Sequence, residues 1–221
     1  MRSILCALIL LSLVGGPIRG EDKPVVLLTG FGPFSGVAIN PSWETVKTFH
    51  DTELGGCRIE TIQLPVVYDE IEPLLQAAIA RYKPKLVISF GVGSQVIQVE
   101  TLARNGYHPV KPKDVKGNPP PREKINPTGP DTYPTRLPAA EIVAALSKEK
   151  IGASTSTDAG GYLCNECFYR IMAAAPPAAA AGFVHVPMYD TKDPAGGKFD
   201  AEKLKAAMKI VIETSLKQVA K

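Results

Sequence analysis

Cysteine is scarce in this sequence, and neither sign of charge is in large excess. The chain has 4 cysteines among 221 residues, whereas small disulfide-stapled domains are cysteine-dense. Its 25 basic residues nearly balance 22 acidic ones, and there is no basic stripe with interleaved aromatics of the kind that binds nucleic acid. These shortages exclude a disulfide scaffold and argue against a nucleic-acid partner.

Long apolar runs are also missing. A run from Ile4 to Val14 is about half of the ~20 residues that a membrane-spanning helix needs. Arg2 precedes this run, and Gly15-Gly16-Pro17 follows it, which is the order of a secretory signal peptide. We therefore expect residues 1–20 to be a signal peptide and the protein to be exported, to the periplasm or outside the cell, without a stable membrane anchor. An uncleaved N-terminal anchor is the alternative.

Three cysteines remain once the predicted leader is removed: Cys57, Cys164 and Cys167. An odd number in an oxidising compartment leaves at least one thiol free or paired between chains. The free thiol is therefore a candidate for chemistry.

Short apolar runs alternate with helical patterns along the rest of the chain. Strands are expected at 25–28, 58–64, 86–90, 153–157 and 182–186, and helices from Asn40-Pro41, at 69–82, 138–150 and 163–174, and after Asp200. Strands that alternate with helices predict a mainly parallel, twisted sheet covered on both faces. We expect a single three-layer α/β/α domain over residues 21–221. Residues 106–138 are rich in proline without periodicity and predict a long loop.

The sharpest local feature runs from Asp158 to Cys167, with the sequence DAGGYLCNEC. Its two glycines permit a tight turn, which places Cys164 in the first turn of the following helix. Free N–H groups and the helix dipole there favour a thiolate, the nucleophilic form of cysteine. A small buried cysteine that only packs is the alternative.

Cys164 and Cys167 also form a CxxC pair at a helix start. Dithiol oxidoreductases use this placement, and an exported location would suit one. The pair lies late in the chain, however, and no thioredoxin-like βαβ start precedes it. A redox protein is therefore the weaker alternative.

His185 lies inside a β-branched strand, FVHVP, near the carboxyl end of that strand. Open α/β sheets place their sites at this edge. A lone strand histidine is usually a core residue, but a cysteine nucleophile needs a base and an acid, and histidine serves as both near neutral pH. His50 and His108 are the other histidines, in apparent helix-end and loop contexts.

A third group usually orients such a histidine. Glu100 follows the glycine-bearing turn after the 86–90 strand, although a glutamate in such a context is most often a solvated surface group. Glu166 and Asp158 lie near Cys164 in sequence and remain open for the same role.

Gly30-Phe31-Gly32-Pro33-Phe34 is a glycine-rich turn after the first strand. It lacks the third glycine of the dinucleotide fingerprint and the GK[ST] of a P-loop. Phe31 and Phe34 fit an apolar wall for a small flat ligand, and a simple core turn is the alternative.

These stretches together resemble the pyroglutamyl peptidase I family, also called pyrrolidone-carboxylate peptidases. Thr29 to Phe34 with Asn40-Pro-Ser42 is similar to the N-terminal signature of that family. The segments 129–133 and 135–138 are similar to its central region. Gly161-Tyr-Leu-Cys-Asn165 and His185-Val-Pro187 resemble its cysteine and histidine motifs. The similarity extends over about residues 25–190 in the family order.

The resemblance implies a peptidase without metal or cofactor that removes N-terminal pyroglutamate from peptides through a Cys–His–Glu triad. Cys164 would be the nucleophile, His185 the base, and Glu100 the orienting carboxylate, since Glu100-x-x-Ala103-x-Asn105 reproduces the family spacing. Phe31, Phe34, Asn40 and Tyr162 would form the substrate pocket. A homo-oligomer is compatible with the resemblance.

The turn between Gly91 and Glu100 is shorter than in the family and lacks its usual glycine pair and arginine. A non-catalytic homologue that binds pyroglutamyl peptides without turning them over is therefore the alternative function.

Overall fold

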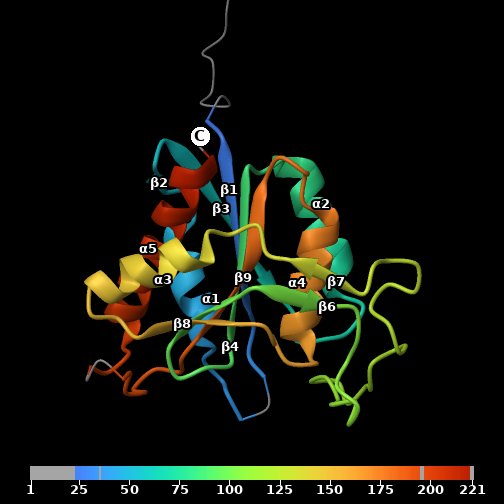
Figure 1. The fold of residues 1–221 in the computed structure, drawn as a ribbon. Helices are drawn as coiled ribbons and strands as arrows, with labels where there is room; N and C mark the ends of the chain where they lie inside the picture. The colour runs from blue at the N-terminus through green and yellow to red at the C-terminus, as the bar shows by residue number, and fades with distance from the viewer. Residues whose placement is uncertain (1–22, 35, 195–196, 220–221) are drawn as a thin grey trace, which may run out of the picture.

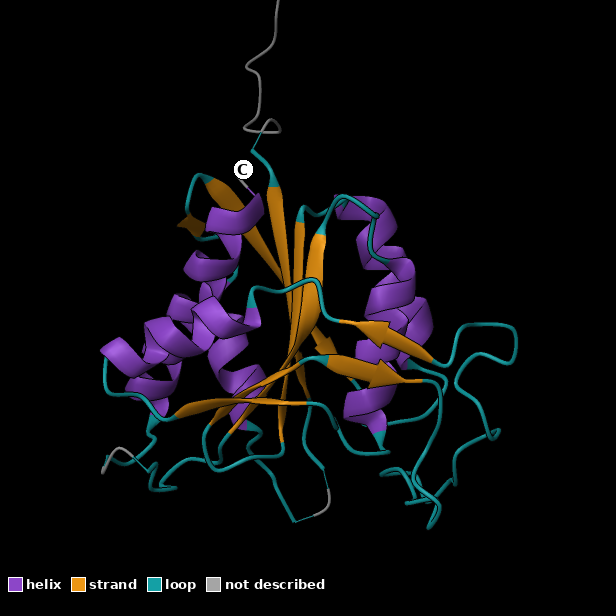
Figure 2. Cartoon of the chain, in the orientation of Figure 1, coloured by secondary structure: helices purple, strands orange, loops and turns teal. Residues whose placement is uncertain are grey.

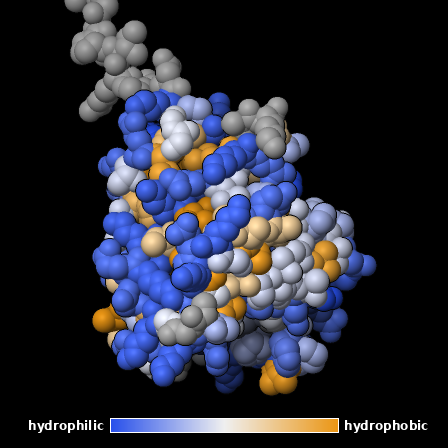
Figure 3. Space-filling model, turned by 60° about the vertical axis from the view of Figure 1, so that its left-hand side comes forward, coloured by the Kyte–Doolittle hydropathy of each residue, from blue (hydrophilic) through white to orange (hydrophobic). Residues whose placement is uncertain are grey.

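The structure of this protein is a computed structural model that describes residues 23–34, 36–194 and 197–219. The predicted signal peptide, residues 1–20, lies outside the described residues. Within them, no helix is both long and apolar enough to span a membrane. The face over helices α3 and α5 is mainly hydrophilic, with scattered hydrophobic patches (Figure 3).

A seven-stranded sheet forms the centre of the molecule, in the order β2-β3-β1-β4-β9-β5-β8 (Figures 1 and 2). The central four strands β3, β1, β4 and β9 are parallel to one another. The strands are β1 (Val25–Phe31), β2 (Glu53–Leu54), β3 (Cys57–Leu64), β4 (Leu86–Val92), β5 (Ile97–Glu100), β8 (Ala153–Ser156) and β9 (Ala180–Val186).

Helices cover both faces of this sheet. Helices α1, α3 and α5 pack on one face and α2 and α4 on the other (Figure 1). The helices are α1 (Pro41–Val46), α2 (Ile71–Tyr82), α3 (Ala139–Lys148), α4 (Leu163–Ala174) and α5 (Ala201–Val219), with a 3₁₀ turn η1 (Lys47–Phe49) after α1. The predicted three-layer α/β/α fold with a mainly parallel sheet is confirmed.

Alternation along the central strand β1 produces two separate cores. Val26 and Leu28 are buried against the α1, α3 and α5 side, whereas Leu27 is buried against the α2 and α4 side. Successive strand residues point to opposite faces, so a strand buried on both sides is apolar throughout, as the sequence VVLL is.

Two predicted helix starts are confirmed in atomic detail. The Asn40 side chain accepts a hydrogen bond from the Ser42 N–H at 3.1 Å, and Pro41 is the first residue of α1. Asp200 accepts from the Lys203 N–H at 2.8 Å at the start of α5. Both satisfy N–H groups that the first helical turn leaves free.

Two strands continue past the glycines at which we expected them to end. Strand β1 runs through Gly30 to Phe31, and β4 runs through Gly91 to Val92. Gly30 is needed there because a β-carbon would lie 2.7 Å from the backbone of Trp43 in α1. These glycines therefore allow close packing within the strand instead of ending it.

The segment 106–138 is long and mostly irregular, as predicted, but it is not without structure. It contains β7 (Thr132–Pro134), which pairs antiparallel with β6 (Leu102–Arg104). Asp114 holds its first half by accepting hydrogen bonds from the N–H groups of Tyr68, Lys116 and Asn118. Local polar side chains thus fix a loop that lacks a hydrophobic pattern.

Candidate active site

Cys164 is the second residue of α4, and its side chain is half-buried. Gly160 has a positive φ of 74°, a conformation that glycine adopts without strain. Gly161 passes so close to the backbone of His108 that a β-carbon would collide with it. The two glycines therefore bring the chain through a narrow turn, after which the first N–H groups of α4 and the positive end of its dipole lie around the thiol.

His185 lies on β9, one residue before its carboxyl end, and is buried. Its Nδ1 is 2.8 Å from Oε1 of Glu100, whose side chain has no exposed surface. Glu100 ends β5, which pairs antiparallel with β9 and so runs back alongside the histidine strand. The carboxylate that sequence context places at the surface is thus fully buried against the imidazole.

The electrostatics favour a charged imidazole. Burial alone lowers the pKa of His185, but the adjacent Cys164 thiol and the hydrogen-bonded Glu100 carboxyl group raise it to about 10. Because Nδ1 faces Glu100, Nε2 is the ring nitrogen left for the thiol. Cys164, His185 and Glu100 thus form a row of thiol, imidazole and carboxylate.

Gly91 near the end of β4 and Gly93 just after it make room for this pair. A β-carbon on Gly91 would lie 3.0 Å from Cys164 Sγ and 2.7 Å from Phe183 Cζ. A β-carbon on Gly93 would lie 2.6 Å from Cδ2 of His185. Sequence reasoning missed these positions, although the Gly91-Val-Gly93 pattern just before Glu100 was the available signal.

A small pocket of about 70 Å³ opens next to Cys164. It contains all four predicted substrate-binding residues, and its lining is mostly apolar. The lining residues are Phe31, Phe34, Asn40, Val66, Val92, Tyr162, Leu163 and Cys164. Val66 and Val92 were not predicted, because an aliphatic residue outside any motif gives no sign of lining a pocket. Leu163 was also not predicted, although it lies within the Gly161–Asn165 motif.

Asn40 contributes to the pocket mainly by shaping it. Its Nδ2 donates to the Gly32 carbonyl oxygen at 2.8 Å, and its Oδ1 accepts from Ser42. The side chain is buried, so these bonds fix the Gly30–Phe34 turn against α1. The two phenylalanines are consequently held in the lining of the pocket.

The other acidic candidates do not contact His185. Asp158 is exposed, and its carboxylate accepts from the Gly160 N–H at 3.0 Å. Glu166 is buried but faces Arg170 and Tyr107. Of the three carboxylates considered from sequence, only Glu100 reaches the imidazole.

Cys167 points away from Cys164 into the core. It has no exposed surface, lies 3.2 Å from the Ser89 hydroxyl, and is a free thiol. Burial raises its pKa, so it stays protonated. A dithiol oxidoreductase needs a second thiol that can attack the first, and this geometry argues against that role.

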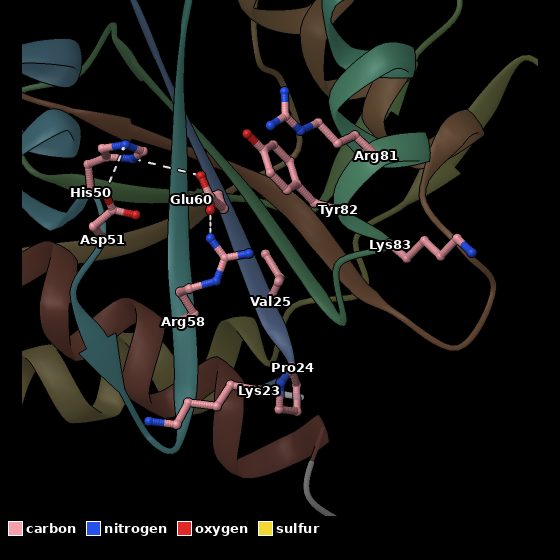
Figure 4. A pocket seen from close by; sticks show the side chains of 10 residues that line it. All are labelled: Lys23, Pro24, Val25, His50, Asp51, Arg58, Glu60, Arg81, Tyr82 and Lys83. Atoms are coloured by element: carbon pink, nitrogen blue, oxygen red, sulfur yellow. Dashed lines mark ion pairs between the residues drawn. The ribbon is translucent and has the colours of Figure 1, made fainter. Parts of the chain in front are cut away.

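A second, larger and polar hollow lies at the amino end of β1 and β3 (Figure 4). Its His50 faces Asp51 through Nε2 at 3.6 Å and Glu60 through Nδ1 at 3.9 Å. Arg58 already pairs with Glu60, and the two carboxylates face opposite ring nitrogens, so the group is poorly arranged for one metal ion. His50 lies at the amino end of the strands, whereas Cys164 lies at their carboxyl end, so the two side chains do not pair. The ring of His108 accepts a hydrogen bond from the Val110 N–H in its own loop.

Comparison with known proteins gives a consistent result. The family model for pyroglutamyl peptidase matches residues 24–218. The chain is 39% identical over 199 residues to a pyrrolidone-carboxylate peptidase of Thermococcus onnurineus, covering 87% of this chain and 98% of that protein. It is 37% identical over 204 residues to pyrrolidone-carboxylate peptidase 1 of Photorhabdus laumondii, covering 86% and 92%. A crystal structure of pyroglutamyl peptidase I from Bacillus amyloliquefaciens superposes with a TM-score of 0.80 at 32% identity, covering 90% of this chain and 98% of that one.

Proposed function

The chain belongs to the pyroglutamyl peptidase family of cysteine exopeptidases, and from this premise we propose that it hydrolyses the amide bond after an N-terminal pyroglutamyl residue by means of Cys164, His185 and Glu100. The single observation that carries the proposal is the side-by-side placement of the Cys164–His185–Glu100 row and the aromatic pocket. The family resemblance drawn from the sequence motifs is confirmed, whereas the roles of individual residues are our proposal.

The first half of the reaction forms an acyl-enzyme. The Cys164 thiolate attacks the pyroglutamyl carbonyl carbon, and the carbonyl oxygen becomes an oxyanion held by free N–H groups at the start of α4. The His185 imidazolium donates its Nε2 proton to the leaving amine as the C–N bond breaks. The products of this half are a thioester on Cys164, a neutral imidazole and the shortened peptide.

The second half releases pyroglutamate. The neutral His185 imidazole takes a proton from water, and the resulting hydroxide attacks the thioester carbonyl. The C–S bond then breaks, which returns the thiolate and the imidazolium. The part of Glu100 is to hold the Nδ1–H tautomer and to stabilise the positive charge on the ring.

Specificity is assigned to the pocket beside the thiol. A lactam ring is small and flat, and the Phe31, Phe34 and Tyr162 rings offer it apolar contact surface. An apolar pocket with few polar groups is the usual form of a site for such a ligand. Peptides with a free glutamine or glutamate at the N-terminus carry a charged amine, and transferring that charge into this pocket is unfavourable.

A fluorogenic pyroglutamyl amide tests the proposal directly. We expect turnover that is abolished when iodoacetamide alkylates the protein and that is protected by added pyroglutamate. Binding of the amide without turnover would instead identify the non-catalytic homologue that the short turn before Glu100 left open. The close fit of Gly91 and Gly93 against the reactive pair supports the catalytic alternative.

A further inference from the structure

Glu166 is a buried charged residue that the reaction does not use. It lies two residues after Cys164 in α4 and has no exposed surface. One turn further along α4, Arg170 places its Nε 3.9 Å from Glu166 Oε1 and its Nη1 2.8 Å from Glu72 Oε1 of α2. The guanidinium is thus shared between a buried and a partly exposed carboxylate.

Tyr107, at the start of the 106–138 loop, completes this group. Its hydroxyl lies against the Glu166 carboxylate. Among the described residues, however, neither that hydroxyl nor either Glu166 oxygen reaches a partner in ordinary hydrogen-bond geometry, and two Arg170 nitrogens share this state. Buried polar groups are nearly always hydrogen-bonded. Glu166, Tyr107 and Arg170 therefore have fewer hydrogen bonds than buried groups usually make, and small movements can change their contacts.

A row of tyrosines connects this group to the substrate pocket. The Tyr107 ring meets Tyr68 edge-on at 5.4 Å, and Tyr68 meets Tyr162 edge-on at 5.7 Å. Tyr162 lines the pocket beside Cys164. We call Tyr107, Tyr68 and Tyr162 the tyrosine wall.

The tyrosine wall also holds part of the 106–138 loop. The Tyr68 hydroxyl donates to the Pro112 carbonyl oxygen at 2.7 Å, and the Tyr162 hydroxyl donates to that of Lys113 at 3.2 Å. A shift of Tyr107 is therefore passed on to the pocket through direct ring contacts, and to the loop through two hydrogen bonds.

Burial favours the protonated form of Glu166. It raises the pKa of this carboxyl from its ordinary value to about 7, and this effect of burial exceeds the opposing effects of Arg170, Tyr107 and Arg122. A raised pKa means that the packed arrangement binds the proton more tightly than an open one does, so stability from this group is lost as the pH rises through about 7. The groups that face Glu166 are Arg170 and Cys167 of α4, Tyr107 and Arg122 of the loop, and Tyr68 and Asp69 of the segment before α2.

We propose that Glu166, Tyr107 and Arg170 form a buried latch that positions the tyrosine wall of the substrate pocket, and that the latch is closed while the Glu166 carboxyl carries a proton. This inference rests on the proposed function, because the pocket is the one assigned to the pyroglutamyl group. Loss of the proton leaves a buried carboxylate that competes with Glu72 for Arg170 and is driven toward water. Tyr107 then moves with it, and the wall loosens.

The decisive measurement is binding of the neutral compound pyroglutamyl amide to a Cys164→Ser protein, which cannot turn it over. Calorimetry over a pH range of roughly 5 to 9 compares this protein with versions that also carry Glu166→Gln, Tyr107→Phe or the matched control Glu202→Gln. The amide introduced by Glu166→Gln cannot ionise, and Glu202 is an exposed residue in the first turn of α5. We expect Kd to rise by at least about fivefold, an ordinary coupling between sites, as the pH passes through about 7.

The pH effect should vanish in Glu166→Gln, shrink in Tyr107→Phe and persist in Glu202→Gln. Equal pH dependence with and without Glu166→Gln would overturn the latch. If pyroglutamyl amide does not bind at any pH, the proposed substrate is wrong. The latch is then decided by the ring NMR signals of Tyr68 and Tyr162, which must shift with a midpoint near 7 in the presence of Glu166 and stay constant in its absence.

Discussion

At the level of single residues, Cys164 and Cys167 lie three positions apart on one helix, yet their thiols have different surroundings. Cys164 faces the pocket at the free end of α4, whereas Cys167 is sealed in the core against Ser89. We expect Cys164→Ser to lower kcat by more than about a thousandfold, since the thiolate nucleophile is lost. Cys167→Ala is the matched control and should keep most of the activity, with some loss of stability. Steady-state kinetics on a pyroglutamyl amide compares them, and near-normal turnover by Cys164→Ser would rule out this nucleophile.

In the proposed triad, Glu100 helps to raise the pKa of His185, through its hydrogen bond and its charge. Glu100→Gln keeps the size of the side chain and removes only that charge, so the pKa of His185 should fall from about 10 toward its ordinary value. We expect kcat to fall about a hundredfold with little change in KM, less than the roughly ten-thousandfold seen in a serine peptidase triad.

The same substitution has a signature in stability. A histidine whose pKa is raised on folding stabilises the protein at low pH, and this contribution is lost as the pH rises from about 6.5 toward about 10. Denaturation measured across this interval should therefore show a smaller pH dependence in Glu100→Gln than in the wild type. Unchanged kinetics and an unchanged pH profile would remove Glu100 from the triad.

Gly93 is important because it has no side chain. A β-carbon there would meet His185 at 2.6 Å, so Gly93→Ala must displace the imidazole. Because a displacement of about 1 Å can cost a hundredfold in rate, we expect a loss of about that size in kcat. Gly106→Ala is the control, since its β-carbon would meet only the Glu123 carbonyl oxygen at 4.0 Å. Equal activity of the two variants would show that the backbone of the turn can move to accommodate the β-carbon without displacing His185.

At the level of secondary structure elements, the helix starts are encoded locally and can be tested one by one. Asp200 accepts from the Lys203 N–H at the start of α5, on the sheet face that does not carry Cys164. Asp200→Ala should lower the free energy of unfolding by about 1 kcal/mol, the usual contribution of such a cap. Urea denaturation measures this loss, and kcat/KM should be unchanged. An equal loss of activity would mean that α5 is coupled to the site.

Local sequence signals account for the elements that were predicted and for those that were missed. The α4 helix was placed at 163–174 because glycines precede it and a helical pattern follows, and its bounds are Leu163–Ala174. The short strand β5 was missed. Its partners are β8 and β9, which are distant in sequence, and nothing local indicates such pairing.

The same reason explains the site. Cys164, His185 and the aromatic turn carry motifs, so the sequence indicated them. The burial of Glu100 and the positions of Val66 and Val92 depend on how β5 and the loops fold back onto the sheet. Of the latch residues, Glu166 and Arg170 are one turn apart on α4. Tyr107 comes from the 106–138 loop, and no local pattern predicts that it lies against them.

At the level of the whole molecule, the predicted signal peptide is still a proposal, and so is a location outside the cytoplasm. The run from Ile4 to Val14 after Arg2 has the length and order of a leader. We expect the mature protein to begin near Glu21 and to be recovered with the exported fraction. N-terminal sequencing after cell fractionation measures both, and an intact Arg2 on a cytoplasmic pool would contradict export.

The two apolar clusters contact the pocket to different extents. The cluster under α2 and α4 adjoins Cys164 and the tyrosine wall, whereas the cluster under α1, α3 and α5 reaches the pocket through Val92. The β9 strand lies between these clusters and carries His185.

We therefore expect stability and substrate specificity to depend on different parts of the molecule. We expect substitutions on α3 and α5 that raise the melting temperature to leave the proposed choice of peptide unchanged, because neither helix lines the pocket beside Cys164. Substitution of Tyr162 is instead expected to change that choice, because Tyr162 lines the pocket. An engineered form of this protein can be stabilised first and given a different specificity afterwards. The surface formed by α3 and α5 is also suited to attaching the protein to a solid support.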